Sequence, residues 1–334
     1  MSTCLMIGNG LNLCHDNISW NGILNDLAKN RHIEYKRNAM PLPLEFERIM
    51  NIYLQKGGVK HRYEAYGSAK REIAKRIKNI TLPSGAVHYG LTKIEPDSII
   101  TTNYDFLIER AYGIPDTDIA IPKKNTLINS YTADVSGMKF YHPHGVVSKP
   151  STICLGYMHY AKIVADLQKS ISKKRNNRNR EMLILQHCRG DITIDHWATK
   201  FYDSDVAIIG FGLALSEIDF WWVLEHRARL MNQQISDAAS LVKNTIVYYD
   251  IMTPEILQRR EGEGLEEYVM RQMEADIENE MKLQKHLLLK SMNVFVKTIY
   301  INRTENKNYI EAYNAIMDDI YNNGIVADKP SLSL

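Results

Sequence analysis

The stretch TCLMIGNG, residues 3–10, is a short apolar run that stops at the glycine turn Gly8-Asn9-Gly10. A mixed segment that suits a helix follows it through Trp20. The stretch DVAIIGFG, residues 205–212, has the same form and leads into the helical pattern of residues 218–231. Both stretches predict a buried strand, a glycine turn and a helix, which is the repeating unit of a parallel sheet.

Further short runs outside these two stretches are rich in β-branched or aromatic residues and also predict strands. They lie at residues 97–102, 138–141, 245–249 and 294–299. Strands that alternate with helices predict a doubly wound, Rossmann-like α/β fold with a parallel sheet covered on both faces. We expect helical insertions near residues 44–80 and 160–197, and a C-terminal strand-helix extension over 245–322. No Pro/Ser-rich linker divides the chain, so a single domain over residues 1–334 is expected.

Composition narrows the class of protein. The 334 residues are 45% hydrophobic and 24% charged, which is typical of a folded globular chain. The formal net charge of +2 argues against a protein that coats nucleic acid with its whole surface. The basic run at residues 169–180 contains no aromatic residue, so it predicts a solvated segment and makes nucleic acid an unlikely partner.

The sequence also bears on location and covalent chemistry. No stretch approaches the ~20 consecutive apolar residues of a membrane-spanning helix, and the first residues do not resemble a secretion signal. A cytoplasmic protein without a membrane partner is therefore expected. The four cysteines show no paired spacing, which predicts buried reduced thiols without disulfides or a structural metal. They are Cys4, Cys14, Cys154 and Cys188.

One charged helical segment, residues 254–291, bears on assembly. Its last part contains an apolar cluster of leucines that packs either within the chain or on a neighbouring copy. The cluster is Leu283, Leu287, Leu288 and Leu289. We expect an oligomer of at least two subunits.

Polar side chains follow two of the predicted strands directly. Thr101-Thr102-Asn103-Tyr104-Asp105 follows one strand and His142-Pro143-His144-Gly145 follows another. Because ligands bind at the carboxyl ends of parallel strands, we expect both turns to meet the loop at Gly8-Asn9-Gly10 in one cleft. Taken alone, Asp105 suits a helix cap and the two histidines suit a surface pair. Two histidines in one turn also make a poor zinc site.

The order of these motifs resembles the sirtuin-like superfamily. The motifs are I-G-N-G at residues 7–10, T-T-N-Y-D at 101–105, H-G at 144–145, and G-F-G-L at 210–213 with S-E-I-D at 216–219. They look most like the bacterial sirtuin-like branch whose members hydrolyse NAD in anti-phage defence. The resemblance covers roughly residues 3 to 250.

This resemblance implies a role for each matched position. Gly8, Asn9 and Gly10 would hold the pyrophosphate of NAD, and Gly210, Phe211 and Gly212 would line the adenosine end. Asn103 would face the nicotinamide ribose, and His144 would be the general base. Asp105 would contact the nicotinamide side of the pocket or cap the following helix.

Two departures from protein-deacylating sirtuins count against a peptide substrate. The chain lacks the four zinc-binding cysteines of their small domain, and Tyr104 stands where they usually carry an aliphatic residue. The resemblance therefore implies an NAD glycohydrolase that releases nicotinamide and ADP-ribose or a cyclic product. A noncatalytic sensor of NAD or an ADP-ribose-like signal, or a partner subunit of a defence complex, is the alternative, and a deacylase is a weaker one. The family also implies a defence partner such as an ATPase.

The sequence predicts that His144→Ala and Asn103→Ala each remove most of the activity and leave the fold intact. Both residues follow strands in turns, where substitution by Ala removes no large apolar group. His142→Ala is expected to be milder and to serve as the control.

Overall fold

The computed structural model describes residues 2–15, 19–36, 40–57, 61–78, 80–83, 85–115, 119, 131–135, 137–172, 182–232, 238–252, 262–301, 306–326 and 332–333. Its centre is a sheet with the strand order β3-β4-β2-β1-β5-β6-β7-β8. The strands are β1 (Ser2–Ile7), β2 (Ser98–Thr101), β3 (Tyr131–Val135), β4 (Met138–Tyr141), β5 (Ser204–Ile209), β6 (Ile246–Met252), β7 (Phe295–Tyr300) and β8 (Leu332–Ser333). Neighbouring strands pair in parallel, except that β3 is antiparallel to β4.

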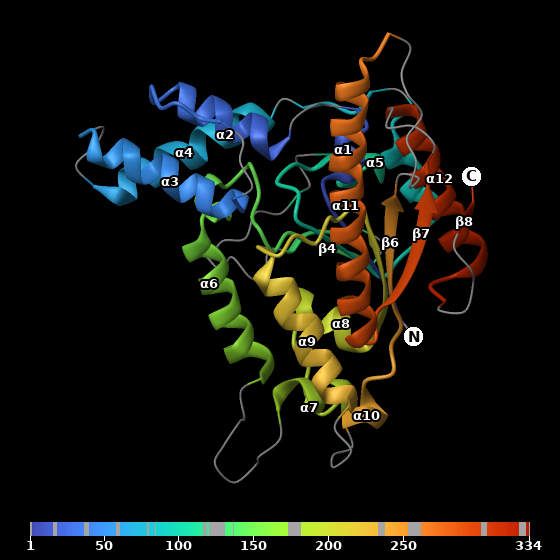
Figure 1. Ribbon diagram of the computed structural model, residues 1–334. Helices are drawn as coiled ribbons and strands as arrows, with labels where there is room; N and C mark the ends of the chain where they lie inside the picture. Colours follow the sequence, from blue (N-terminus) through green and yellow to red (C-terminus); the bar gives the residue numbers. More distant parts are fainter. Residues whose placement is uncertain are drawn as a thin grey trace.

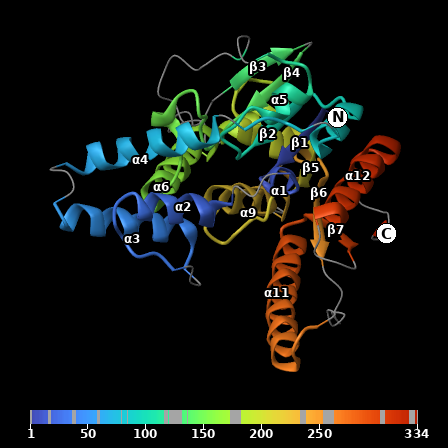
Figure 2. The same ribbon diagram turned by 90° about the horizontal axis from the view of Figure 1, so that it is seen from above.

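Helices cover both faces of this sheet, as Figures 1 and 2 show. They are α1 (Gly10–Leu13), α2 (Trp20–Lys29), α3 (Leu42–Gln55), α4 (Arg62–Ile77), α5 (Leu107–Ala111), α6 (Tyr157–Leu167), α7 (Leu183–Arg189), α8 (Lys200–Asp203), α9 (Ile218–Asn232), α10 (Ala238–Leu241), α11 (Leu265–Ser291) and α12 (Asn306–Asn323). Shorter helical turns are η1 (Val87–Lys93), η3 (Pro150–Thr152), η4 (Gln168–Ser172) and η5 (Trp197–Thr199). The doubly wound α/β fold is thereby confirmed.

The alternation of side chains along β1 explains why the sheet has two cores. Leu5 and Ile7 point into a core shared with α1 to α5 and α12, whereas Cys4 and Met6 point into one shared with α6 to α10. Successive residues of a strand face opposite sides of a sheet, so a strand apolar at every position is buried on both faces. The continuous apolar run that ends at Gly8 is thus the sequence signature of a central parallel strand.

The two helical insertions differ in how closely they follow expectation. The predicted hairpin near residues 44–80 is confirmed as α3 and α4, which pack beside α2 (Figure 2). The second insertion contains α6, η4 and α7, but the chain from residue 190 to 196 is not helical because Gly190 ends α7 with φ +87°. Of the basic run, residues 173–180 lie outside the described residues.

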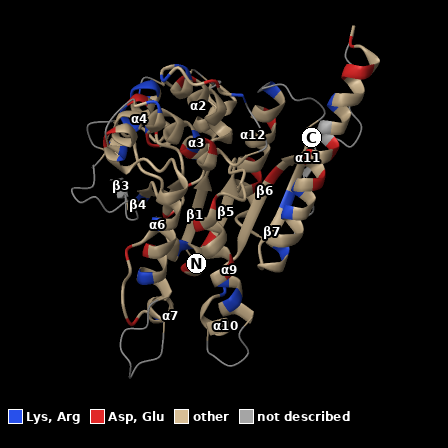
Figure 3. Ribbon diagram, turned by 60° about the vertical axis from the view of Figure 1, so that its left-hand side comes forward, with Lys and Arg blue, Asp and Glu red and all other residues tan. Residues whose placement is uncertain are grey.

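The long helix α11 extends away from the sheet, with acidic residues toward its N-terminal end (Figure 3). The predicted leucine cluster is split by this geometry. Leu289 is fully buried against the sheet, whereas Leu283, Leu287 and Leu288 are 46%, 60% and 40% exposed. Packing within the chain thus accounts for Leu289 alone, and an oligomer stays a prediction.

Two further findings concern the cysteines and membranes. All four cysteines are free, and three are buried, whereas Cys188 is half-buried rather than buried as expected. Within the described ranges, no helix combines the length and the apolar character that crossing a lipid bilayer requires.

The register of the central strands brings the predicted functional turns to one edge. Ile7 at the end of β1 lies opposite Thr101 of β2 and Ile209 of β5, and Ile100 lies opposite Tyr141 of β4. The loops after β1, β2, β4 and β5 therefore leave the sheet at the same carboxyl edge. The chain order reverses between β1 and β5, where open α/β sheets bind ligands.

Candidate functional site

A cleft opens at this carboxyl edge. One wall is polar and comes from the strand-end loops, and the other is apolar and comes from α2, the end of α4 and the residues after it. The lining residues are Asn9, Asn12, Trp20, Ile23, Ile77, Ile80, Thr102, Asn103, Tyr104, Asp105, His144, Tyr160 and Glu217. Four of the predicted site residues, Asn9, Asn103, Asp105 and His144, thus meet in one place.

The glycines of the predicted site do not line this cleft, and close packing explains two of them, Gly8 and Gly10. A Cβ on Gly8 would lie 2.4 Å from the carbonyl oxygen of Gly210, and one on Gly10 would lie 2.8 Å from it. The N–H groups of Gly8 and Gly10 donate to the carbonyls of Ile209 and Gly210 at 3.0 and 2.8 Å. The glycines therefore let the loops after β1 and β5 touch. Their predicted contact with the pyrophosphate stays a prediction, as does the role of Phe211 and Gly212 at the adenosine end.

Three hydrogen bonds hold Asn103 in place, and one polar atom of its side chain has no partner among the described residues. Its side-chain Nδ2 donates to the carbonyl of Gly8 at 3.4 Å, and its backbone N–H donates to Thr101 Oγ1 at 3.1 Å. His142 Nδ1 donates to the backbone carbonyl of Asn103 at 2.8 Å. The side-chain Oδ1 is buried and has no hydrogen-bond partner among the residues described. Because a buried acceptor normally has a donor, this atom points to a ligand hydroxyl or water.

The side chain of His142 holds the backbone of Asn103 in place. Its side chain is fully buried, so the view of the two histidines as a surface pair is wrong. Nδ1 donates to the Asn103 carbonyl and Nε2 donates to Glu109 Oε1 at 2.7 Å, and both nitrogens carry a proton only in the imidazolium form. Burial by itself lowers the pKa of His142, but the Glu109 carboxylate outweighs it and the pKa lies above its usual value. His142→Ala is therefore not a mild control.

We expect His142→Ala to lower the free energy of unfolding by about 3–5 kcal/mol at pH below ~6.5, because it removes one partner of a buried ion pair. A folded-state pKa above the unfolded value stabilises fully at low pH, and this stabilisation is lost as pH rises through the folded pKa. The loss should therefore shrink with rising pH in urea unfolding curves. His187→Ala, which breaks a half-buried pair with Asp203, is the control and should cost about 1 kcal/mol or less. If His142→Ala lowered the free energy of unfolding equally at every pH, the ion pair assigned to His142 and Glu109 would be contradicted.

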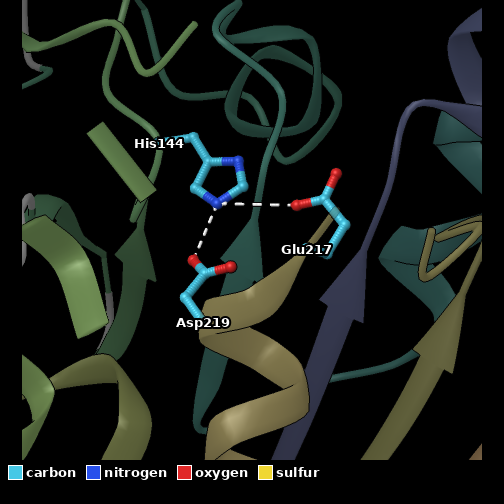
Figure 4. Close-up of side chains that lie close together, drawn as sticks. All are labelled: His144, Glu217 and Asp219. Atoms are coloured by element: carbon cyan, nitrogen blue, oxygen red, sulfur yellow. Dashed lines mark hydrogen bonds and ion pairs between the residues drawn. The ribbon is translucent and has the colours of Figure 1, made fainter. Parts of the chain in front are cut away.

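His144 contacts two carboxylates through one ring nitrogen (Figure 4). Nε2 lies 2.9 Å from Asp219 Oδ2 and 3.8 Å from Glu217 Oε2. In the neutral ring, Nε2–H donates to Asp219 and Nδ1 keeps its lone pair. Figure 4 shows both contacts ending on the same ring nitrogen. The ring is 3% exposed and meets Tyr160 edge to face at 5.2 Å. Burial by itself lowers the pKa of His144. The carboxylates of Asp219 and, after it, Glu217 outweigh this effect, so the pKa lies above its usual value.

Because His144 and Asp219 are buried, the expectation that His144→Ala leaves the fold intact has to be corrected. His144→Ala would leave the buried Asp219 carboxylate without the donor at Oδ2, which costs about 1–3 kcal/mol in comparable cases. Alanine at this position therefore weakens the fold, contrary to the expectation that the fold stays intact.

The two carboxylates are the functional residues that sequence analysis missed. The S-E-I-D motif supported the resemblance, but acidic residues at a helix start are common because they complement the helix dipole. The side chain of Asp219 is fully buried and that of Glu217 is 18% exposed. Burial, reinforced by Asp219 and opposed by His144, raises the pKa of Glu217 to about 7.

His144, Glu217 and Asp219 also form a possible donor set for a metal ion, with ligand atoms within 4.8 Å of one another. The expectation of no metal considered only the spacing of the four cysteines and the two histidines of one turn. The absence of a metal therefore stays a prediction.

Asp105 has one of its two expected roles, because it binds the first N–H of α5, and it also lines the cleft, while its contact with the nicotinamide side of a ligand stays a prediction. Its Oδ1 accepts the backbone N–H of Leu107 at 3.0 Å, which caps α5, and its Oδ2 accepts Asn12 Nδ2 at 2.9 Å. Asn12 Oδ1 in turn accepts from His88 Nε2 at 2.8 Å. Burial raises the pKa of Asp105. Both oxygens of Asp105 are thus used to order the cleft wall, and Asn12 is a lining residue that the sequence did not single out.

Aromatic rings form much of the remaining wall. Trp20 of α2 meets the ring of Tyr104 edge to face at 5.6 Å. The Tyr104 hydroxyl donates to the carbonyl of Cys154 and so turns its polar end away from solvent. No lysine or arginine of the described chain lines the cleft. The cleft therefore combines carboxylates and aromatic rings without a positive side chain other than His144.

One comparison with known proteins gives a match, and it covers all of the motifs except the one at residues 7–10. Residues 97–233 match a family model described as a SIR2-like domain, and this span contains Asn103, His144, Glu217 and Asp219. The comparison with curated proteins finds no match to the chain.

Proposed function

Because residues 97–233 carry a SIR2-like domain, we propose that the protein is a glycohydrolase that cleaves the bond between nicotinamide and ribose in NAD. The observation that carries the proposal is the unpartnered Oδ1 of Asn103. It lies in the same cleft as His144, whose Nε2 is held by Asp219. Hydrolysis of an N-glycosidic bond needs an acceptor that positions a hydroxyl or water and a general base close to it, and Asn103 Oδ1 and His144 can supply these two groups.

The reaction consumes NAD and one water and gives nicotinamide, ADP-ribose and one proton. The bond between the ring nitrogen and C1′ breaks with its electron pair going to nicotinamide, which leaves neutral. Because the leaving group is already cationic in NAD, no strong acid is required. Water adds to C1′ and its proton passes to Nδ1 of His144, while Asp219 stabilises the imidazolium that forms.

Asn103 positions the reacting groups. Its amide is fixed by Gly8 and its backbone by His142, so Oδ1 is already oriented before substrate enters. It accepts a hydrogen bond from a ribose hydroxyl or from the attacking water without adding a charge. A preorganised acceptor loses little entropy on binding, which favours the reactive arrangement.

We further propose that this activity serves anti-phage defence by depleting NAD, which the motif resemblance supports. In such a role the protein would assemble as a homo-oligomer and act beside a second component such as an ATPase.

The test is incubation of the purified protein with NAD and chromatographic identification of the products. Nicotinamide and ADP-ribose, or a cyclic product, are expected, and Asn103→Ala should lower the rate about a hundredfold. The control is Asn30→Ala, whose side chain bonds Glu72 on the surface and does not line the cleft. Binding of NAD without turnover, with or without a defence partner, would favour a sensor. Nicotinamide release that requires an acylated peptide would favour a deacylase.

A further inference from the structure

The longest of the described helices presents an apolar face to solvent. Nine large apolar side chains of α11 are between 40% and 64% exposed. They are Leu265, Val269, Met270, Met273, Ile277, Met281, Leu283, Leu287 and Leu288. At about 100° per residue, all of them fall within one face roughly 160° wide, which we call the α11 stripe. A folded monomer rarely exposes so long an apolar face, so the α11 stripe marks an interaction surface.

The opposite face of α11 holds the helix against the sheet. Leu289 is fully buried there, and His286 Nε2 lies 2.7 Å from Asp250 Oδ2. Lys282 Nζ donates to the backbone carbonyl of Ile251 at 3.1 Å. These contacts come from the last third of the helix, and Figures 2 and 3 show its other end extending away from the sheet. Because the helix is fixed by that face, the α11 stripe stays turned to solvent.

The charges of α11 are divided unevenly along its length, as Figure 3 shows. Residues 265–280 contain six acidic residues and one arginine, whereas residues 281–291 contain three lysines and no acidic residue. A partner with one sign of charge would suit one half of this helix and repel the other. A second copy of the helix in the antiparallel direction suits both halves, because each acidic half then lies beside a basic one.

We propose that the α11 stripe is the contact surface of a homodimer, in which the α11 helices of two copies pack antiparallel about a two-fold axis. Such an axis brings the same face of both copies together, so that each stripe buries the other. The exposed Lys290 of one copy then lies near Glu266 and Glu267 of the other. The inference rests on the homo-oligomer proposed above and names its surface, but it does not depend on cleavage of NAD.

The first test is the mass of the natural protein by light scattering at micromolar concentration, which should be twice that of the 38.5 kDa chain. Ile277→Glu and Met281→Glu each place a charge in the α11 stripe. Each should raise the dissociation constant of the dimer about a hundredfold or more, measured by sedimentation equilibrium. Because Glu favours a helix at least as well as Ile or Met, α11 should stay folded, which circular dichroism checks.

The matched control for these substitutions is Met158→Glu. Met158 lies on α6 and is 66% exposed, close to the 64% of Met281, but it is not part of the α11 stripe. The dissociation constant of this variant should stay within about twofold of the natural value.

The direction of packing is tested by exchanging charges. Lys290→Glu and the double variant Glu266→Lys, Glu267→Lys should each weaken the dimer about tenfold, because like charges then meet at both ends of the helix pair. A mixture of the two variants should form a mixed dimer with about the natural dissociation constant, because its charges are again opposite at both ends. In a parallel dimer the exchanged residues would not meet, and mixing would restore nothing.

Three outcomes would overturn the proposal. A mass of one chain at every concentration would mean that a different partner covers the α11 stripe. A dimer that persists in both Ile277→Glu and Met281→Glu would have its interface elsewhere. Mixed charge variants that associate no better than each alone would exclude the antiparallel arrangement. The assay with NAD reports on the proposed activity separately, so the failure of one proposal is distinguishable from the failure of the other.

Discussion

Replacing His144 by Gln is expected to lower kcat for NAD cleavage by about 10²–10⁴-fold, because an amide cannot take a proton from the attacking water. The glutamine amide retains an N–H that can serve the buried Asp219, so the variant should fold more securely than His144→Ala. The dissociation constant for a carbocyclic NAD analogue, which cannot be hydrolysed in the same way, should change little, since the loss lies in the chemical step.

The control for this substitution is another histidine–carboxylate pair of the same geometry. His187 Nε2 lies 2.9 Å from Asp203 Oδ2 and neither residue lines the cleft. His187→Gln should therefore leave kcat within about twofold of the natural value. Thermal unfolding of both variants checks that each is folded. Full activity of a folded His144→Gln protein would refute its role as the base.

The second large effect is expected for substitution of Asp219, although this residue does not itself accept the proton of the attacking water. Asp219→Asn removes the charge that supports the His144 imidazolium, and the new amide can donate to Nε2 and shift the ring proton to Nδ1. A ring with its proton at Nδ1 cannot accept one there. We expect kcat to fall by about 10²–10⁴-fold, close to the effect of losing His144 itself.

The pH profile distinguishes a positioning role of Asp219 from a purely structural one. Asp219 raises the pKa of His144, so the residual activity of Asp219→Asn should reach its plateau at lower pH than that of the natural protein. The double variant Asp219→Asn, His144→Gln should be little worse than either single variant, since the two side chains act as one unit. Independent, additive losses would contradict the coupling.

Several features of the fold could be predicted from local sequence because they depend on short-range physics. A short run apolar at every position, such as residues 4–7 or 206–209, is typical of a strand buried on both faces, and the structure places both at the centre of the sheet. The hairpin of α3 and α4 was also predictable, because its apolar residues recur at helical spacing on both sides of a glycine pair.

Other features could not be predicted because they depend on partners far apart in the chain. The turn at residues 142–145 looks like a surface loop, yet His142 is buried by its bonds to Asn103 and to Glu109, which lies 33 residues earlier. The glycines at residues 8 and 10 look like a phosphate loop, yet they touch a loop some 200 residues later. Neither contact can be recognised from the local sequence pattern.

By itself, the sequence determined the doubly wound sheet, and it singled out Asn103, Asp105 and His144, because polar residues directly after parallel strands must meet at one edge. Only the tertiary structure decided how these residues are used. It gave His144 its carboxylate partner 75 residues away, brought Glu217 to 3.8 Å from the same ring nitrogen, and left Asn103 Oδ1 without a donor among the described residues. The positions of the strands follow from short-range apolar patterning, whereas the protonation and pairing of a buried group depend on every charge that folding brings near it.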